Sequence, residues 1–229
     1  MRTLAIGDIH GCYAALRALE EFVPFRDEDR IVALGDFIDR GPQSYEVVEW
    51  LIARGARLGP AGLIPILGNH EELLFTSRGD PIMRHAWESA CGGWQTLESY
   101  RSAGADDPDS PMGVPPAHWQ FFKSCANYFE TGSHIYVHAS LDPDLPLAMQ
   151  PREALRWIRF GELPPHFSGK TVICGHTPQP ERRPTSIGHA ICIDTGVYAN
   201  DGWLTCFDAE TGEYWQANYP GTETRRGSL

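Results

Sequence analysis

Gly35-Asp36-Phe37-Ile38-Asp39-Arg40-Gly41 is the stretch from which the rest of the chain can be interpreted. It follows an apolar run, residues 30–34, that is typical of a buried strand, and it precedes a helical pattern over residues 44–54. Two acids and an arginine therefore lie in a glycine-bounded loop at the carboxyl end of a strand. Open α/β sheets place their chemistry at that edge. Taken alone, the loop is equally compatible with a plain turn, because Asp and Gly are common turn residues.

Two similar units flank this loop. Apolar runs at residues 4–6 and 63–67 end in Gly7-Asp8-Ile9-His10-Gly11 and Gly68-Asn69-His70-Glu71. Three strand-loop-helix units in succession predict a largely parallel sheet at the start of an α/β fold. Helical pieces and breakers then predict a helical cap over about residues 72–125.

The second half of the chain is rich in strands. Alternating or apolar runs predict strands at residues 134–138, 171–174, 190–194, 203–207 and 213–216. At 229 residues the chain fits one sizeable domain, which we expect over residues 1–220. Residues 221–229 are polar, and we expect them to be a disordered tail.

Charge and cysteine content exclude several classes of protein. The net charge is 19 − 30 = −11, so we expect neither nucleic-acid nor membrane binding, which rely on dense Lys and Arg. The six cysteines form no C-x-x-C pair, which favours reduced thiols in a cytoplasmic protein. The first predicted strand begins at Leu4, so we expect no signal peptide. The sequence leaves the oligomeric state open.

Metal-type ligands gather immediately after the predicted strands. They are Asp8, His10, Asp36, Asn69, His70, His138 and His176. Carboxylate, amide and imidazole groups suit divalent ions such as Mn²⁺, Fe²⁺ or Zn²⁺, and thiolates are absent from the set. In Asp8-x-His10, alternate residues of an extended segment point the same way and can reach one ion. The set exceeds what one ion takes with water positions left open, so it predicts two ions bridged by a carboxylate.

These motifs resemble those of a known family. Together with Val137-His138-Ala139 and Gly175-His176-Thr177, the three glycine-bounded motifs are similar to the signatures of the phosphoprotein phosphatase family of binuclear metallophosphoesterases. Gly92-Gly93 with Thr96-Leu97, and Trp157-Ile158-Arg159, resemble its small bacterial and phage-type serine/threonine phosphatases. The resemblance covers about residues 4–196. It implies the calcineurin-like metallophosphoesterase fold (α/β, or α+β by some schemes), with two mixed β-sheets sandwiched between helices and a helical cap insertion.

The resemblance also implies a ligand set for two divalent ions, with Mn²⁺ favoured and Fe, Zn or Ni as alternatives. One ion would be held by Asp8, His10 and Asp36. The other would be held by Asp36, Asn69, His138 and His176. Asp36 would then bridge the two ions.

The same resemblance implies the catalytic roles. Arg40 and Arg159 would grip the phosphoryl oxygens, since a guanidinium fork suits that anion. His70, oriented by Asp39, would protonate the leaving oxygen. A metal-bridging hydroxide would attack phosphorus in line.

The main functional prediction is a serine/threonine protein phosphatase, acting on phosphoproteins and on other phosphomonoesters. An alternative with the same metal site is a symmetrical bis(5'-nucleosyl)-tetraphosphatase. That group typically lacks an acid at the position of Asp39, so Asp39 favours the protein phosphatase. A nuclease or cyclic-nucleotide phosphodiesterase would show Gly-His-x-His, whereas the sequence here is Gly175-His176-Thr177-Pro178.

A third hypothesis is a non-catalytic scaffold of the same fold. Scaffolds tend to lose ligands, and every expected ligand type is present here. One departure from the family pattern is Ser140, which stands where a glycine is usual, beside the predicted ligand His138. Its hydroxyl is small, so we expect activity to be retained.

Overall fold

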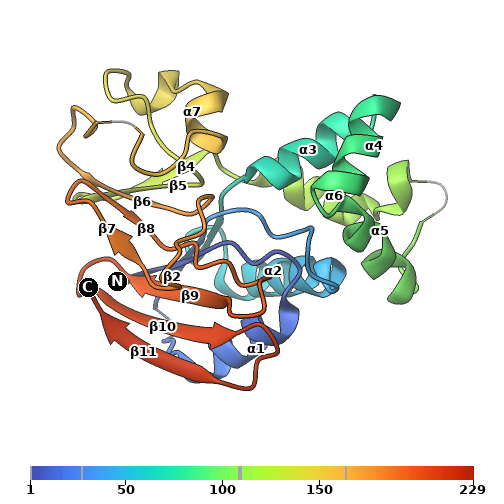
Figure 1. The fold of residues 1–229 in the computed structure, drawn as a ribbon, viewed down its shortest axis with the longest axis horizontal. Helices are drawn as coiled ribbons and strands as arrows, with labels where there is room; N and C mark the ends of the chain where they lie inside the picture. Colours follow the sequence, from blue (N-terminus) through green and yellow to red (C-terminus); the bar gives the residue numbers. More distant parts are fainter. Residues whose placement is uncertain (1, 27, 108–109, 163) are drawn as a thin grey trace.

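The chain forms two β-sheets with helices on their outer sides and a helical lobe at one end (Figure 1). The computed structural model describes residues 2–26, 28–107, 110–162 and 164–229. Its strands are β1 Thr3–Ile6, β2 Arg30–Ala33, β3 Leu63–Pro65, β4 Tyr128–Glu130, β5 His134–Val137, β6 Thr171–Cys174, β7 Thr185–Ser186, β8 Ala190–Cys192, β9 Trp203–Asp208, β10 Glu213–Asn218 and β11 Thr224–Ser228. Its helices are α1 Tyr13–Phe22, α2 Ser44–Leu58, α3 Asn69–Ser77, α4 Pro81–Ala90, α5 Gly93–Ser102, α6 Pro116–Ser124 and α7 Arg152–Arg156, with short 3₁₀ turns at Pro111–Gly113 and Leu147–Met149.

The first sheet has the strand order β11-β10-β9-β1-β2-β3. Strands β1, β2 and β3 are parallel, whereas β9 runs antiparallel to β1, so the sheet is mixed. The second sheet has the order β4-β5-β6-β8-β7, with β5, β6 and β8 parallel. Both sheets are mixed, as the family resemblance implies. The parallel strands bring their carboxyl ends to a common edge, which positions the site.

Apolar burial explains why the two sheets stack. One core cluster lies between them and includes Val32, Tyr136, Ile173 and Phe207, all fully buried. A second cluster joins the first sheet to α1, α2 and the cap helices, and a third covers the outer face of the second sheet. The β1, β2, β5 and β6 strands are apolar on both faces because both faces are covered.

Helices α3 to α6 form the lobe that stands beside the sheets (Figure 1). They occupy most of the region predicted to be a helical cap, and we call them the cap. Helix α4 is held at its start by Asp80, whose side chain accepts hydrogen bonds from the backbone N–H groups of Ile82 and Met83. Buried Trp87 of α4 packs against Gly93, where a Cβ would lie 2.3 Å from the indole ring. Helices α4 and α5 therefore pack through a contact that only glycine permits.

The prediction of a disordered tail over residues 221–229 is wrong. Residues Thr224–Ser228 form β11, which pairs antiparallel with β10. Its side chains alternate between partly buried and exposed, and the guanidinium of Arg225 lies 4.0 Å from the centre of the Trp203 ring. Arg225 Nε also donates a hydrogen bond of 2.7 Å to Gln216 Oε1. A polar edge strand held by backbone pairing and a cation–π contact carries no apolar signal in its sequence.

The six cysteines are free, and four of them are buried. None of the helices formed by the described residues combines the length and the apolar character that crossing a lipid bilayer requires.

Candidate active site

The loops after β1 and β2 are locked together by their backbones. The N–H groups of Ile9 and His10 donate to the carbonyl of Asp36 at 3.0 and 2.8 Å, and the N–H of Gly41 donates to the carbonyl of His10 at 2.9 Å. A Cβ on Gly41 would lie 2.2 Å from that same carbonyl oxygen, so glycine is required there. The side chains carried by the two loops therefore have fixed relative positions.

Strained backbone is concentrated at this edge. Seven non-glycine residues with positive φ occur among the described residues, and five of them are predicted site residues: His10, Asp36, Asp39, Arg40 and His176. This conformation costs a residue with a side chain about 1–2 kcal/mol. A strained backbone conformation persists where many surrounding contacts hold it in place. Residues with strained backbones are most frequent at functional sites.

Glu71 is the group that holds the loop after β2 in its strained conformation. Its fully buried carboxylate accepts hydrogen bonds from the N–H groups of Asp36, Phe37 and Gly68 at 2.8–3.0 Å. Burial and the nearby Asp36 charge raise the pKa of Glu71 to about 8, although the donated hydrogen bonds oppose this rise. Sequence reasoning gave Glu71 no role, even though it stands inside the Gly68–Glu71 motif.

Two groups of side chains offer donor atoms that converge closely enough to hold cations. One group is His10, Asp36 and His70, and the other is Asp36, His138 and His176. Within each group the donor atoms lie within 4.8 Å of one another. Asp36 belongs to both groups, which is compatible with the bridging role that the family resemblance implies for it.

The orientation of the histidines fits bound cations. His10 Nδ1 lies 2.9 Å from the carbonyl of Ile38, and His138 Nδ1 lies 2.8 Å from the carbonyl of Leu34, so each Nδ1 carries the proton. The Nε2 lone pairs then face the Asp36 carboxylate at 3.5 and 3.4 Å. Metal-ligating histidines show this pattern, in which the remote ring nitrogen donates to a backbone carbonyl. The two Nε2 atoms and the carboxylate are thus hydrogen-bond acceptors that converge with no proton to share. Such an arrangement favours a bound cation.

The carboxylate that faces these rings is kept ionised. Burial would raise the pKa of Asp36, but electrostatic attraction to the surrounding imidazoles of His138, His70 and His10 and the hydrogen bond from the His70 N–H hold the pKa below its ordinary value. Burial also lowers the pKa of His10 and His138, which favours the neutral, ligating form of each ring.

The two remaining predicted ligands border the same space. The Asn69 amide oxygen lies 2.8 Å from His138 Nε2 and 3.0 Å from His176 Nδ1. Asp8 is buried at the end of β1 and accepts a hydrogen bond from the backbone N–H of His176 at 3.0 Å. Asp8 stands in neither three-residue group; His70 completes the first one instead. A Cβ on Gly175 would lie 2.0 Å from Asp8 Oδ1, so this corner is also closely packed.

The predicted general acid and its partner are in contact. His70 Nδ1 donates to Asp39 Oδ2 at 2.7 Å, which leaves Nε2 facing Arg40 Nη2 at 3.2 Å. Asp39 has no exposed surface, and its carboxylate also accepts hydrogen bonds from Trp87 Nε1 and Thr96 Oγ1. Asp39 therefore orients the ring of His70 and joins it to α4 and α5 of the cap.

Arg159 is less closely associated with the cluster than Arg40. It follows α7 and is exposed, and no hydrogen bond or ion pair of its side chain is found among the described residues. The segment that carries it is fixed at two points: the carbonyl of Trp157 lies 3.2 Å from His176 Nε2, and Trp157 Nε1 donates to Glu72 at 2.9 Å. The backbone near Arg159 is thus placed beside the cluster while its side chain is free to turn.

Two further residues at the site escaped the sequence analysis. Asp194 is buried, and burial raises its pKa to about 7. It lies just beyond β8, so the same strand-end pattern could have identified it. The Tyr198 ring contacts His10, with centroids 5.1 Å apart, and the Arg40 guanidinium lies 4.3 Å from its centre. No sequence signal distinguishes Tyr198 from an ordinary loop residue.

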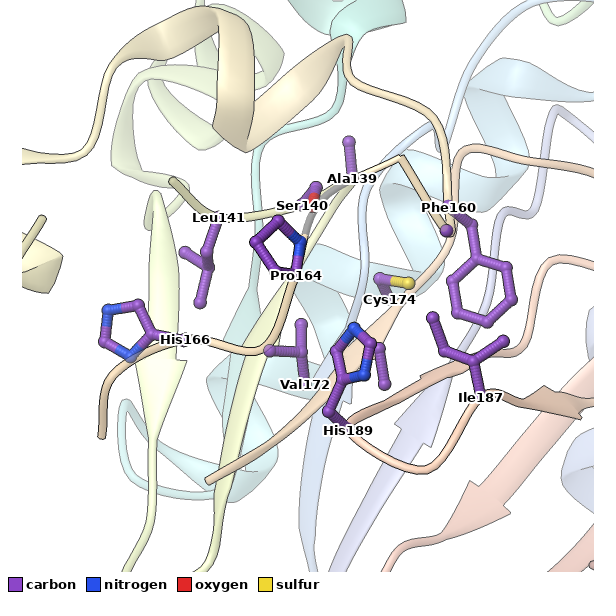
Figure 2. A pocket seen from close by; sticks show the side chains of 12 residues that line it. Ala139, Ser140, Leu141, Phe160, Pro164, His166, Val172, Cys174, Ile187 and His189 are labelled. Atoms are coloured by element: carbon purple, nitrogen blue, oxygen red, sulfur yellow. The ribbon is translucent and has the colours of Figure 1, made fainter. Parts of the chain in front are cut away.

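Ser140, the departure from the family pattern, lies beside a small cavity. Ser140 lines it together with Leu141, Cys174 and His189, and no predicted ligand or catalytic residue takes part (Figure 2). The cavity offers about 20 Å³, room for about one water molecule.

The chain belongs to the calcineurin-like phosphoesterase family, whose model matches residues 1–180. This membership confirms the resemblance and the fold predicted from the motifs. Members of this family are hydrolases that bind divalent metals, and the two groups of side chains described above are suited to such ions.

Three comparisons describe its relatives. An asymmetrical bis(5'-nucleosyl)-tetraphosphatase of Bacillus velezensis is 27% identical, and the match covers 85% of this chain and 84% of that protein. A symmetrical bis(5'-nucleosyl)-tetraphosphatase of Methylococcus capsulatus is 44% identical over 87 residues, which are 37% of this chain and 30% of that protein. The crystal structure of a putative diadenosine tetraphosphatase has a TM-score of 0.63 at 22% identity, over 99% of this chain and 93% of that one.

The prediction of a serine/threonine protein phosphatase is wrong, because these sequence relatives are named as bis(5'-nucleosyl)-tetraphosphatases. The prediction depended on Asp39 as the discriminating residue. In the structure Asp39 is fully buried and bonds to His70, Trp87 and Thr96. Since Asp39 has no surface for a substrate to contact, it does not distinguish a phosphoprotein from a nucleotide directly.

Proposed function

We propose that this protein hydrolyses bis(5'-nucleosyl) tetraphosphates and cleaves them symmetrically. The observation that carries the proposal is the similarity to tetraphosphatases: one matches 85% of the chain, and a symmetrical one reaches 44% identity over 87 residues. The site supports it as well. The substrate is a polyanion and this protein is acidic overall, so the phosphate chain can bind only where positive charge is concentrated. The buried cluster, which is suited to cations, is such a place.

Each predicted site residue has a part in this proposal. One divalent ion, Mn²⁺ in our proposal, would be held by Asp8, His10 and Asp36. A second would be held by Asp36, Asn69, His138 and His176. When bound, such ions supply Lewis-acid charge and lower the pKa of water.

The remaining groups act on the substrate directly. Arg40 lies against the first group, with its Nη2 3.2 Å from His70 Nε2, so it can grip oxygens of the phosphoryl group under attack. Arg159 can turn toward the same phosphoryl group or toward the next one along the chain. His70 Nε2, which faces Arg40, would deliver a proton to the leaving oxygen, while Asp39 fixes the ring.

Asymmetrical cleavage is the second candidate, and one observation favours it. The asymmetrical relative from Bacillus velezensis matches the chain along most of its length, whereas the symmetrical relative matches 37% of it. The two modes differ in which phosphoryl group sits at the cluster and share the machinery described above.

Product analysis distinguishes the candidates. Protein stripped of metal and reloaded with Mn²⁺ is incubated with diadenosine tetraphosphate, and the nucleotides are separated by ion exchange. We expect ADP as the only product. Equal amounts of ATP and AMP would establish the asymmetrical mode instead, and an intact substrate alongside hydrolysis of p-nitrophenyl phosphate would refute the proposal. The Asp36→Asn variant serves as the control for contaminating phosphatases.

A further inference from the structure

A pocket in the cap opens directly beside the predicted phosphate clamp. It offers about 530 Å³ and is lined by Arg40, Tyr198, Trp94, Glu88 and Gln95, among others. Small-molecule sites typically occupy about 300–1,000 Å³ and combine aromatic walls with a few polar groups. No role has been assigned above to this pocket or to Trp94.

Two lining residues connect the pocket to the cluster. Arg40 lines it while its Nη2 atom lies 3.2 Å from His70 Nε2. Tyr198 lines it while its ring contacts His10 edge-on. A molecule with one phosphoryl group at the cluster and Arg40 beside it would therefore extend its next atoms into this pocket.

The position of the pocket relative to Arg40 is rigid. The N–H of Arg40 donates to the carbonyl of Gly92 at 3.3 Å, and a Cβ on Gly92 would lie 2.4 Å from the Arg40 nitrogen. Gly92 has a φ of +90° and immediately precedes α5, which carries Trp94. Arg40 thus makes this backbone contact itself, and Trp94 lies two residues after its partner Gly92.

Trp94 has the properties of a stacking platform. It is 53% exposed, which is unusual for so large an apolar side chain on α5. The Arg101 guanidinium lies 5.3 Å from the centre of its ring, and this cation–π contact helps to hold the ring in place. Nucleobases stack on exposed aromatic rings of this kind whatever their sequence. The polar residues Glu88, which is paired with Arg84 at 2.7 Å, and Gln95 also line the pocket.

We propose that this pocket binds one nucleoside of the substrate, with the base stacked on Trp94 and the phosphate chain passing Arg40. This inference rests on the proposed function, since it assigns a place to the nucleoside of a nucleotide substrate. It makes Trp94 a specificity-determining residue that favours nucleotides over phosphomonoesters without a base.

Binding without turnover tests the pocket separately from the reaction. Isothermal titration calorimetry on the Mn²⁺-loaded protein would compare adenosine 5'-methylenediphosphonate with methylenediphosphonate, which has the same phosphonate groups and no nucleoside. We expect the nucleoside to tighten binding about 10-fold, the effect of one stacked base. Trp94→Ala should abolish most of that advantage, and Trp94→Phe should keep most of it. Ile82→Ala, which shortens an 81% exposed side chain elsewhere in the cap, should leave the advantage as it is.

The inference is overturned if the wild-type protein binds both ligands equally, or if Trp94→Ala retains the full nucleoside advantage. A hydrolytic comparison completes the test: Trp94→Ala should lower kcat/KM for diadenosine tetraphosphate about 10-fold relative to kcat/KM for p-nitrophenyl phosphate. If diadenosine tetraphosphate is not cleaved while the Trp94-dependent binding persists, the proposed function fails and the nucleoside pocket stands.

Discussion

The edge of the sheets and the cap pocket border the same cluster, but they are built differently. At the edge, Asp36, His10 and His138 are almost completely buried, and hydrogen bonds fix both the backbone and the rings. In the pocket, Trp94 is half exposed and held by a single cation–π contact. Rigid, pre-organised groups suit the stabilisation of a reacting centre. An open pocket held by few contacts can be altered without disturbing those groups.

The contrast between the edge and the cap pocket explains why the family prediction was right and the substrate prediction was wrong. The motifs at the edge indicated the family, and the family is confirmed. The substrate prediction was wrong, because it was drawn from Asp39, a buried residue of the edge, and not from the cap. Residues that contact the variable part of a substrate carry the information about specificity.

The largest effect should follow from Asp36→Asn. Because Asp36 belongs to both groups of ligands, the amide would remove charge from both at once. We expect kcat/KM for p-nitrophenyl phosphate to fall more than about 1,000-fold. Glu21→Gln removes the same charge from the exposed face of α1 and should leave activity intact. A variant at position 36 that kept a tenth of the activity would contradict the shared role.

A smaller loss should follow from Asp39→Asn, at the boundary between the edge and the cap. The amide can no longer accept from His70, Trp87 and Thr96 together, so the ring of His70 loses its fixed orientation. We expect activity to fall about 10–100-fold, as for other residues that orient a catalytic group.

The leaving group gives this second prediction its control. Phenyl phosphate has a more basic leaving oxygen than p-nitrophenyl phosphate, and so depends more on a proton from His70. The loss caused by Asp39→Asn should therefore be greater for phenyl phosphate. Equal losses on the two substrates would mean that Asp39 supports the fold without orienting an acid.

The contact between Gly92 and Arg40 is tested by its effect on stability. Gly92→Ala would force a Cβ to 2.4 Å from the Arg40 nitrogen at a φ of +90°. We expect the free energy of unfolding to fall by about 2–4 kcal/mol, from overpacking plus backbone strain. Gly104→Ala is the matched control, since it has a φ of +63° and nothing within 4 Å, and it should cost only about 1 kcal/mol. Urea denaturation measures both, and similar losses would remove the steric argument.

Much of the fold followed from local pattern. Thr171–Cys174 was predicted with its observed bounds, because a short apolar run between polar loops has few other solutions. Strand β11 was missed because Thr224–Ser228 is polar and is held by pairing with β10. Such pairing depends on the position of a distant strand, which local sequence does not contain.

The residues of the site also divide into those that local sequence predicts and those that it does not. His10, Asp36 and His138 could be predicted because each follows a strand, and parallel strands bring their ends together. Tyr198 could not, since its contacts with His10 and Arg40 depend on how a loop of the second half folds back over the first. The pairing of Glu71 with four backbone N–H groups, those of Asp36, Phe37, Ile38 and Gly68, likewise depends on the placement of the loops and has no local sequence signal.

Asp39 joins three helices through one carboxylate: His70 lies in the first turn of α3, Trp87 lies in α4 and Thr96 lies in α5. Proteins open in parts before they unfold as a whole, and exposed helical segments open first. When α4 and α5 separate from the sheets on warming, Asp39 loses Trp87 and Thr96 and keeps only His70, so the cap no longer holds this pair in position. Heat inactivation should therefore precede melting of the sheets, and the enzyme should recover on cooling as the cap closes again.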